Sequence, residues 1–182
     1  MSNPIIVCPT DCTGEVPPIN QDECNPIVDI SEVSKLYMTN IDQPLADWTS
    51  LAEWTTRIDN AGVLVSDIRE WWVSGELPEP DRNITEIDNQ REVTSPADYE
   101  LNLEVFDMDT ITYDALRLLQ CGGRKLIWYA AGNYLYGGTT GIEADVIADY
   151  IITKGSKEIN MGTLKIKWEA KHSPERITNP ML

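Results

Sequence analysis

The sequence predicts a mainly β protein, a two-sheet β-sandwich or barrel with one or two flanking helices. Segments of alternating apolar and polar residues recur along most of the 182 residues, whereas only two segments have helical spacing. The hydrophobic content is 42%, which is typical of a globular domain and not of a disordered chain. A chain of this length forms one domain of ordinary size. We therefore expect one β domain over residues 28–182, preceded by an arm over residues 1–27.

The first 27 residues predict an extended arm, because they contain five prolines and little periodicity. The apolar run at residues 5–7 favours an arm that lies on a neighbour over one that stays in solvent. Three of the four cysteines lie in this arm, and their C-x3-C-x11-C spacing is not that of a zinc site. We expect free thiols at Cys8, Cys12, Cys24 and Cys121, or a disulfide within the arm, and we expect no bound metal or cofactor.

The domain then begins with a strand and a short helix. Residues 32–41 alternate in a strand pattern. Ser50 followed by Glu53 matches a capping box, and Gly62 is a residue that can end the helix. The apolar face of this helix would consist of Leu51, Trp54 and Ile58.

A long polar excursion separates the next two strands. One or two strands are expected within residues 63–75. Residues 75–98 are polar and acidic, and they predict a long loop or a protruding hairpin centred on residues 84–93. Residues 99–106 form a regular strand pattern in which Glu100 and Glu104 face outward.

The second helix is expected at residues 109–121, with Asp109 or Thr110 as the N-cap and Gly122 after the last turn. Its apolar stripe would consist of Ile111, Ala115, Leu118 and Leu119. The last third predicts strands near 124–132, 134–138, 142–152 and 159–171, joined by glycine-rich turns, and then a C-terminal tail over residues 172–182.

The strand near residues 142–152 carries an unusual row of carboxylates. Side chains on a strand alternate between faces, so Glu143, Asp145 and Asp149 lie on one side of the sheet. Asp is uncommon in strands, and neighbouring like charges repel. We therefore treat this acidic face, together with Glu100 and Glu104, as the candidate functional surface.

The net charge is −16, and it is divided unevenly along the chain. Residues 1–123 contain 24 acids and 6 bases, a net of −18, whereas residues 124–182 contain 6 acids and 8 bases, a net of +2. Attraction to a nucleic acid backbone requires Lys and Arg, so this charge argues against ordinary nucleic acid binding. The sequence has neither a signal peptide pattern nor an apolar run of membrane-spanning length, so we expect the protein to be made in the cytosol.

The chain offers little catalytic chemistry, and we do not expect an enzyme. The single histidine, His172, stands beside Ser173 and Pro174, where an exposed position is more natural than a general base. The glycine-rich segments GGTTG and CGGRK lack phosphate-loop spacing, and the acidic runs lack the order of a calcium loop. Six aromatic residues could form either a sugar-binding platform or core and subunit contacts, and we favour the core: Trp71, Trp72, Trp128, Tyr129, Tyr134 and Tyr136.

The layout of residues 99–180 resembles that of tail tube (major tail) proteins of tailed bacteriophages, especially phages of Bacteroidetes-type hosts. The resemblance lies in the order DALRLLQCGG, LYGGTTGIEADVIADYIITKGS and LKIKWEAKHSPERITNP, and the cysteine-bearing arm departs from it. It implies a two-sheet β-sandwich with a flanking helix and no catalytic role. It also implies homohexameric rings that stack into a tube through loops and arms, together with other tail proteins, and let DNA pass without specific binding.

We therefore expect a structural virion protein of the tail, assembled in the host cytoplasm and not in a membrane, in which Glu143, Asp145 and Asp149 face the DNA path. Two alternatives remain. One is another virion part, such as a capsid decoration or connector protein. The other is a carbohydrate-binding or adhesin module that uses the Trp and Tyr residues.

Overall fold

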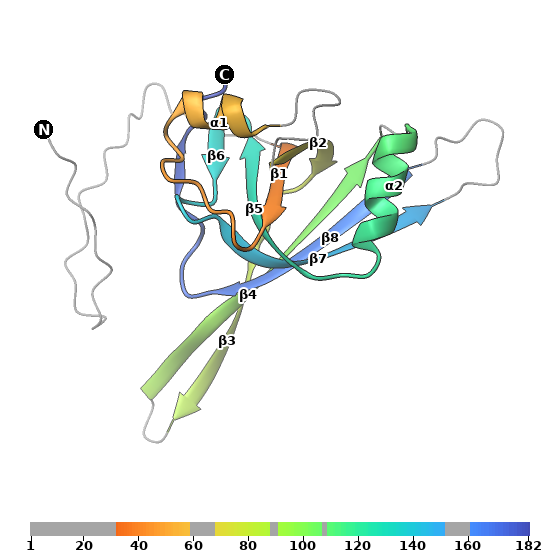
Figure 1. Cartoon of the computed structure of the whole chain (residues 1–182). Helices are drawn as coiled ribbons and strands as arrows, with labels where there is room; N and C mark the ends of the chain where they lie inside the picture. Colours follow the sequence, from red (N-terminus) through yellow and green to blue (C-terminus); the bar gives the residue numbers. More distant parts are fainter. Residues whose placement is uncertain (1–31, 59–67, 88–90, 107–108, 152–160) are drawn as a thin grey trace, which may run out of the picture.

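The computed structural model describes residues 32–58, 68–87, 91–106, 109–151 and 161–182 (Figure 1). The arm expected over residues 1–27 lies outside these ranges, as does Gly62. The elements in chain order are β1 (Val33–Asn40), α1 (Leu51–Arg57), β2 (Arg69–Gly75), β3 (Pro80–Ile87), β4 (Arg91–Val105), α2 (Thr110–Leu119), β5 (Arg124–Ala131), β6 (Tyr134–Tyr136), β7 (Ile142–Ile151), β8 (Met161–Ala170) and β9 (Arg176–Thr178).

The mainly β fold class is confirmed, and the strands form one antiparallel sheet that closes on itself. The pairing runs β1-β2-β4-β8-β7-β5, and β5 also pairs with β1, which completes a six-stranded barrel. Closure removes most unpaired strand edges. The contact between β2 and β4 is the narrowest in this circuit, because only Ser74 and Glu104 are in register there.

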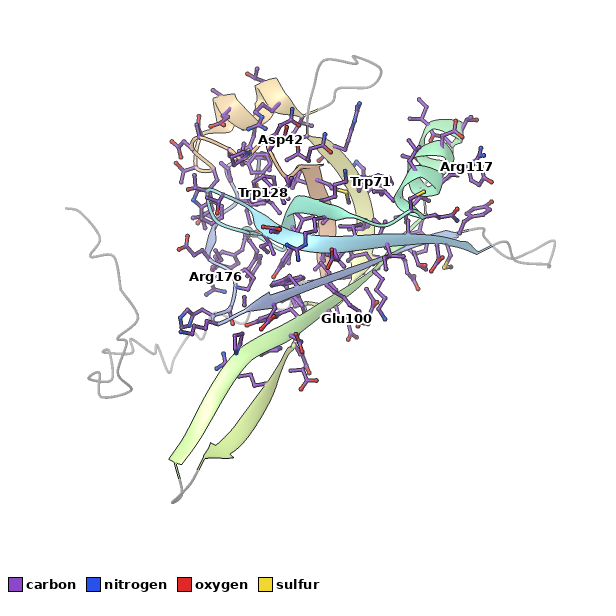
Figure 2. All side chains as sticks on the ribbon, turned by 60° about the horizontal axis from the view of Figure 1, so that its bottom comes forward. Asp42, Trp71, Glu100, Arg117, Trp128 and Arg176 are labelled. Carbon is purple, nitrogen blue, oxygen red and sulfur yellow. The ribbon has the colours of Figure 1, made fainter. Side chains whose placement is uncertain are left out.

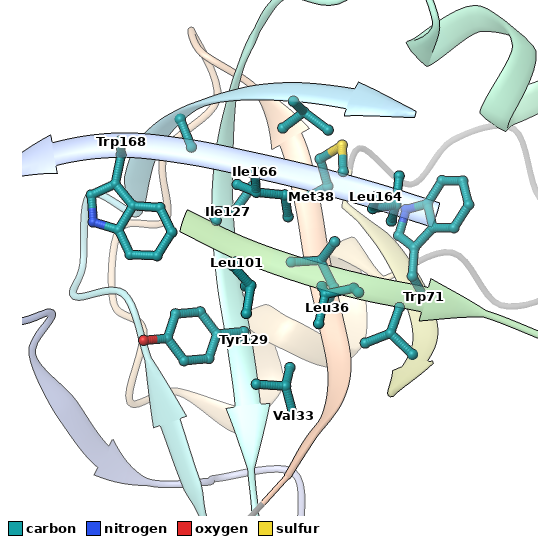
Figure 3. Packing of buried hydrophobic residues seen from close by; sticks show 14 of the residues in the cluster. Val33, Leu36, Met38, Trp71, Leu101, Ile127, Tyr129, Leu164, Ile166 and Trp168 are labelled. Carbon is teal, nitrogen blue, oxygen red and sulfur yellow. The ribbon is translucent and has the colours of Figure 1, made fainter. Parts of the chain in front are cut away.

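The barrel interior is filled by the apolar sides of the alternating strands. On β4, for example, Leu101, Leu103 and Val105 are buried, whereas Glu100 and Glu104 between them are exposed. Figure 3 shows this core, in which the side chains of Trp168 and Trp71 lie toward opposite ends. Each strand therefore presents its polar side to the outside of the barrel.

A second core lies outside the barrel wall, between β1, β5 and helix α1. The indole of Trp54 on α1 contacts the ring of Trp128 edge to face, with ring centroids 5.5 Å apart. Ile177 of β9 and Met181 pack against the same cluster. The segment expected as a C-terminal tail is therefore partly built into the domain, because β9 pairs with β6.

Helix α1 is shorter than its sequence pattern predicted. Ser50 is the N-cap, and its hydroxyl accepts a hydrogen bond from the backbone N–H of Glu53. The carboxylate of Glu53 does not complete the capping box, since it accepts from the N–H groups of Ala46 and Asp47 instead. The helix ends at Arg57, and the next residue is already extended.

Helix α2 covers one end of the barrel, but its predicted apolar stripe is partly wrong. Asp109 caps it by accepting from the N–H of Thr112 at 2.7 Å, as expected. Leu116 is the residue that enters the barrel core, whereas Ile111 and Leu118 are 74% and 78% exposed. The side of the helix that packs on the barrel is therefore centred on Leu116, one residue after the Ala115 of the predicted stripe.

Strands β3 and β4 form a hairpin that projects from the barrel (Figure 1). It lies in the segment where the sequence predicted a long loop or hairpin. Strand β4 is 15 residues long, so its first part belongs to the hairpin and its second part to the barrel wall. The hairpin and the barrel thus share one continuous strand.

Candidate functional site

The five carboxylates singled out from the sequence lie on one face, the outer side of strands β4, β8 and β7. We call this surface the acidic face. On β7, Ala144, Val146 and Ala148 are buried, so Glu143, Asp145 and Asp149 point outward. Strand β4 contributes Glu100 and Glu104. Figure 2 shows the three strands side by side, with Glu100 on β4.

Strand β8 lies between the two acidic strands and carries two lysines. Lys167 is in register with Asp145 on one side and with Glu100 on the other. The Glu100 carboxylate accepts from Lys165 Nζ at 2.8 Å and from Lys167 Nζ at 3.0 Å. Both lysines are therefore bound to a carboxylate of their own chain.

These contacts change the acidity of Glu100. Hydrogen bonds from Lys165, then Asn102 and then Lys167 stabilise its charged form and lower its pKa to about 2. Glu100 is therefore ionised throughout the physiological pH range. The carboxylate is fixed by three donors, although it lies at the surface.

Arg124 at the start of β5 binds the other acidic strand. Its guanidinium donates to Glu143 Oε1 at 2.7 Å, and its Nε lies 3.7 Å from Asp145 Oδ1. The hydrogen bond to Glu143 and the charges of both carboxylates raise the pKa of Arg124. Among the described residues, Asp149 and Glu104 form no ion pair.

Two hollows of about 1040 and 820 Å³ lie along the acidic face. They share Glu79 and Glu100, which lie where one hollow meets the other. Eleven carboxylates line the pair against only three cations, Arg124, Lys165 and Lys167; the carboxylates are those of Glu32, Glu76, Glu79, Asp81, Asp98, Glu100, Glu104, Glu143, Asp145, Asp149 and Glu169. The face therefore carries a strong net negative charge even after its internal pairs are counted.

The acidic row could be recognised from the sequence, but most of its surroundings could not. The position of Lys165 and Lys167 between the acids could not be predicted, because strand order is not visible from periodicity. The sequence did contain one indication. Lys165 and Lys167 are at alternate positions of one predicted strand, and Glu143 and Asp145 are at alternate positions of another, so opposite charges could face each other across a strand pair. The carboxylates at residues 76–81 lie in a segment without a strand pattern, so their position beside the acidic row could not be predicted.

Most of the aromatic residues considered for a sugar platform are inside the protein. Trp71, Trp128 and Tyr129 are buried, so their rings have no free face for stacking. Trp72 is 65% exposed, and the Lys35 ammonium lies 4.3 Å from its ring centroid. His172 is exposed, as expected.

Within the described ranges, no group of three or more His, Cys, Asp or Glu residues is arranged to hold a metal ion. Neither helix in these ranges has the length and apolar character needed to cross a bilayer.

Comparison with known proteins adds no family to these observations. No protein-family model matches the chain, and no curated protein matches it at a significant level.

Proposed function

We propose that the protein is a structural subunit that assembles into stacked rings, and that its acidic face lines a channel through which DNA passes. This is the role of a phage tail tube protein, and it would place the protein in the tail of a virion. The observation that carries the proposal is the acidic face itself, with eleven carboxylates against three cations along two adjoining hollows.

The charge pattern suits a surface that must not retain DNA. Phosphates bind to proteins mainly through Lys and Arg. Each of the three cations on the acidic face lies beside a carboxylate of the same chain, Glu100 in the case of both lysines and Glu143 and Asp145 in the case of Arg124. A passing phosphate would have to displace these carboxylates, so DNA would slide past without being held.

The range of this repulsion sets a limit on the channel. The screening length is about 8 Å at physiological salt, so the carboxylates act only on DNA that is already inside a narrow bore. A ring must therefore bring the acidic faces of several subunits close around one axis.

The projecting β3–β4 hairpin supports assembly. Within the described residues, β3 pairs only with β4, so its other edge presents backbone donors and acceptors. Such an edge is a natural site for pairing with another chain. A hairpin that extends beyond the barrel can reach a neighbouring subunit in the ring or in the next ring.

Electron microscopy of the purified protein tests the proposal. We expect rings, of sixfold symmetry by the resemblance, and end-to-end stacks whose bore is lined by Glu143, Asp145 and Asp149. Light scattering should show a mass several times that of one chain. A monomer at high concentration, with and without tail-initiator proteins, would contradict the proposal, as would an assembly whose acidic face points outward and whose bore is lined by Lys and Arg.

A further inference from the structure

Helix α2 carries an apolar patch that no described residue covers. Ile111 and Leu118 are 74% and 78% exposed, and they lie two helical turns apart on the side opposite the buried Leu116. The half-buried Ala115 lies between them on the same side of this ten-residue helix, with the exposed Asp114 beside it, so the two aliphatic side chains are the apolar part of a candidate contact surface. We call Ile111 and Leu118 the α2 patch.

We propose that the α2 patch is covered by residues 5–7 of the same chain, the sequence Ile-Ile-Val. This is the longest run of aliphatic residues before residue 32. Burial of these side chains against the α2 patch removes apolar surface from water on both sides of the contact.

The charge of the arm favours its first residues over the rest. Residues 1–10 contain no Asp, Glu, Lys or Arg, whereas residues 11–31 contain five acids and no base. Residues 32–182 contain 25 acids and 14 bases, a net of −11, so the acidic part of the arm is repelled by the domain. The first ten residues form the longest uncharged stretch of the arm, and they can approach the surface with the least repulsion.

The start of the described chain lies close enough for this contact. Glu32 accepts a hydrogen bond from the Ser74 hydroxyl and lines the same hollow as Asp149. The next residue along β7, Tyr150, packs edge to face on Tyr113 of α2. The 24 residues between Val7 and Glu32 span up to about 80 Å, which exceeds the distance across a domain of this size.

The arm of the same chain is favoured over that of a second copy. A tethered segment competes at an effective concentration in the millimolar range, well above that of free chains in a dilute solution. For unassembled chains at micromolar concentration, the contact within one chain should therefore dominate.

Two cysteines make the contact measurable. Cys8 directly follows the aliphatic run, and the exposed Cys121 lies three residues after Leu118. In the full-length Cys12→Ser/Cys24→Ser variant, oxidation with copper phenanthroline in air should join Cys8 to Cys121. The matched Cys8→Ser/Cys12→Ser variant keeps Cys24 and Cys121, and we expect it to form its link about tenfold more slowly. Equal rates in the two variants would overturn the proposal.

Mixing labelled and unlabelled chains separates the two possible sources of the arm. Mass spectrometry of a ¹⁴N and ¹⁵N mixture should show Cys8–Cys121 links within one isotope only. Links that join the two isotopes in statistical proportion would show that a second copy supplies the arm, and this would overturn the assignment to the same chain.

Substitutions in the patch and in the arm complete the test. Ile111→Ser/Leu118→Ser changes only exposed side chains, so the fold is retained, and it should slow the Cys8–Cys121 link about tenfold. Ile5→Ser/Ile6→Ser should have the same effect. Val16→Ser/Ile19→Ser is the matched control and should leave the rate unchanged. Unchanged rates in the first two variants, or an equal loss in the control, would overturn the proposal.

Discussion

The indole Nε1 of Trp128 donates a hydrogen bond of 2.7 Å to the carbonyl oxygen of Gly138. The turn that supplies this carbonyl wraps around the indole, because a Cβ added at Gly137 or Gly141 would lie 2.5 or 2.7 Å from it. Both glycines have positive φ, at 140° and 76°. The segment GGTTG is thus a tight turn that packs around a core tryptophan. The sequence predicted a glycine-rich turn at this position.

Gly137→Ala should destabilise the domain more than Gly123→Ala. The two glycines have nearly the same φ, 140° and 136°, but nothing lies within 4 Å of a Cβ at Gly123. Gly123→Ala should therefore cost only the backbone strain, about 1–3 kcal/mol, and Gly137→Ala about 1–3 kcal/mol more from the clash with Trp128. Urea unfolding of both variants measures the difference, and equal losses would show that Trp128 moves away freely.

Leu116→Ala should cost about 2–5 kcal/mol, because it empties a position in the barrel core. Leu118→Ala, two residues away on the same helix, should change the free energy of unfolding by less than about 1 kcal/mol, because it removes only part of the proposed contact with residues 5–7. Thermal and urea unfolding compare the two. A loss for Leu118→Ala as large as that for Leu116→Ala would mean that the predicted stripe, rather than the observed one, packs on the barrel.

Glu53→Ala should cost more than Ser50→Ala. The Glu53 carboxylate accepts from the N–H groups of Ala46 and Asp47, both at 2.7 Å, so its removal loses two short hydrogen bonds to a charged acceptor, at a cost of about 1–3 kcal/mol. The Ser50 hydroxyl accepts one longer bond of 3.4 Å, and Ser50→Ala should cost about 0.5–1 kcal/mol. Unfolding by urea ranks the two variants, and the reverse order would contradict these contacts.

The stability that Glu100 contributes should disappear in acid. Its pKa is lowered in the folded state to about 2 from an ordinary value of 4.5, so its contribution is complete above about pH 4.5 and is lost as the pH falls toward 2. The melting temperature of Glu100→Gln should therefore lie below that of the natural protein at pH 7 and approach it between pH 4.5 and 2. Glu104→Gln, at a site without an ion pair among the described residues, should track the natural protein throughout. A difference for Glu100→Gln that persists at pH 2 would argue against the lysine contacts.

If the acidic face lines a DNA channel, lysines placed on it should retain DNA. Glu104→Lys/Asp149→Lys replaces two carboxylates that form no ion pair among the described residues, so no cation is left without a partner. Particles built with this variant should release DNA more slowly, and added salt should reduce the delay because phosphate contacts weaken with salt. Asp42→Lys, on the exposed turn after β1, is the control and should release DNA at the natural rate. A normal rate in the first variant, with tails intact, would count against the channel.

Much of the fold could be predicted from alternation and cap residues. Glu100 and Glu104 are predicted to face outward and are exposed, and Asp109 is predicted to cap α2 and does so. Both signals depend on neighbours in sequence, so they need no knowledge of strand order. Closure of the barrel could not be predicted from such local signals, because the pairing of β1 with β5 joins residues about 90 positions apart.

The errors also have physical reasons. Ile111 and Leu118 share a helical stripe with Ala115, and spacing alone cannot decide which of two adjoining stripes faces the barrel. Leu116 occupies the core position because the helix crosses the barrel end beside Gly162, where a Cβ would come within 2.5 Å of the leucine side chain. The acidic row was correctly placed on one side of a strand, but its pairing with lysines depends on the β7–β8 and β4–β8 registers.

The length of β4 has a mechanical consequence. Its first part forms the projecting hairpin with β3, and its second part is bonded to β8 at nine successive register positions, from Ala97 with Ala170 to Val105 with Gly162. A pull along the hairpin would load these hydrogen bonds in shear, all together, instead of opening them one after another. The hairpin is thus anchored in the barrel wall through β4. Tension on it would be borne mainly by the hydrogen bonds to β8, since β2 pairs with β4 at a single register position.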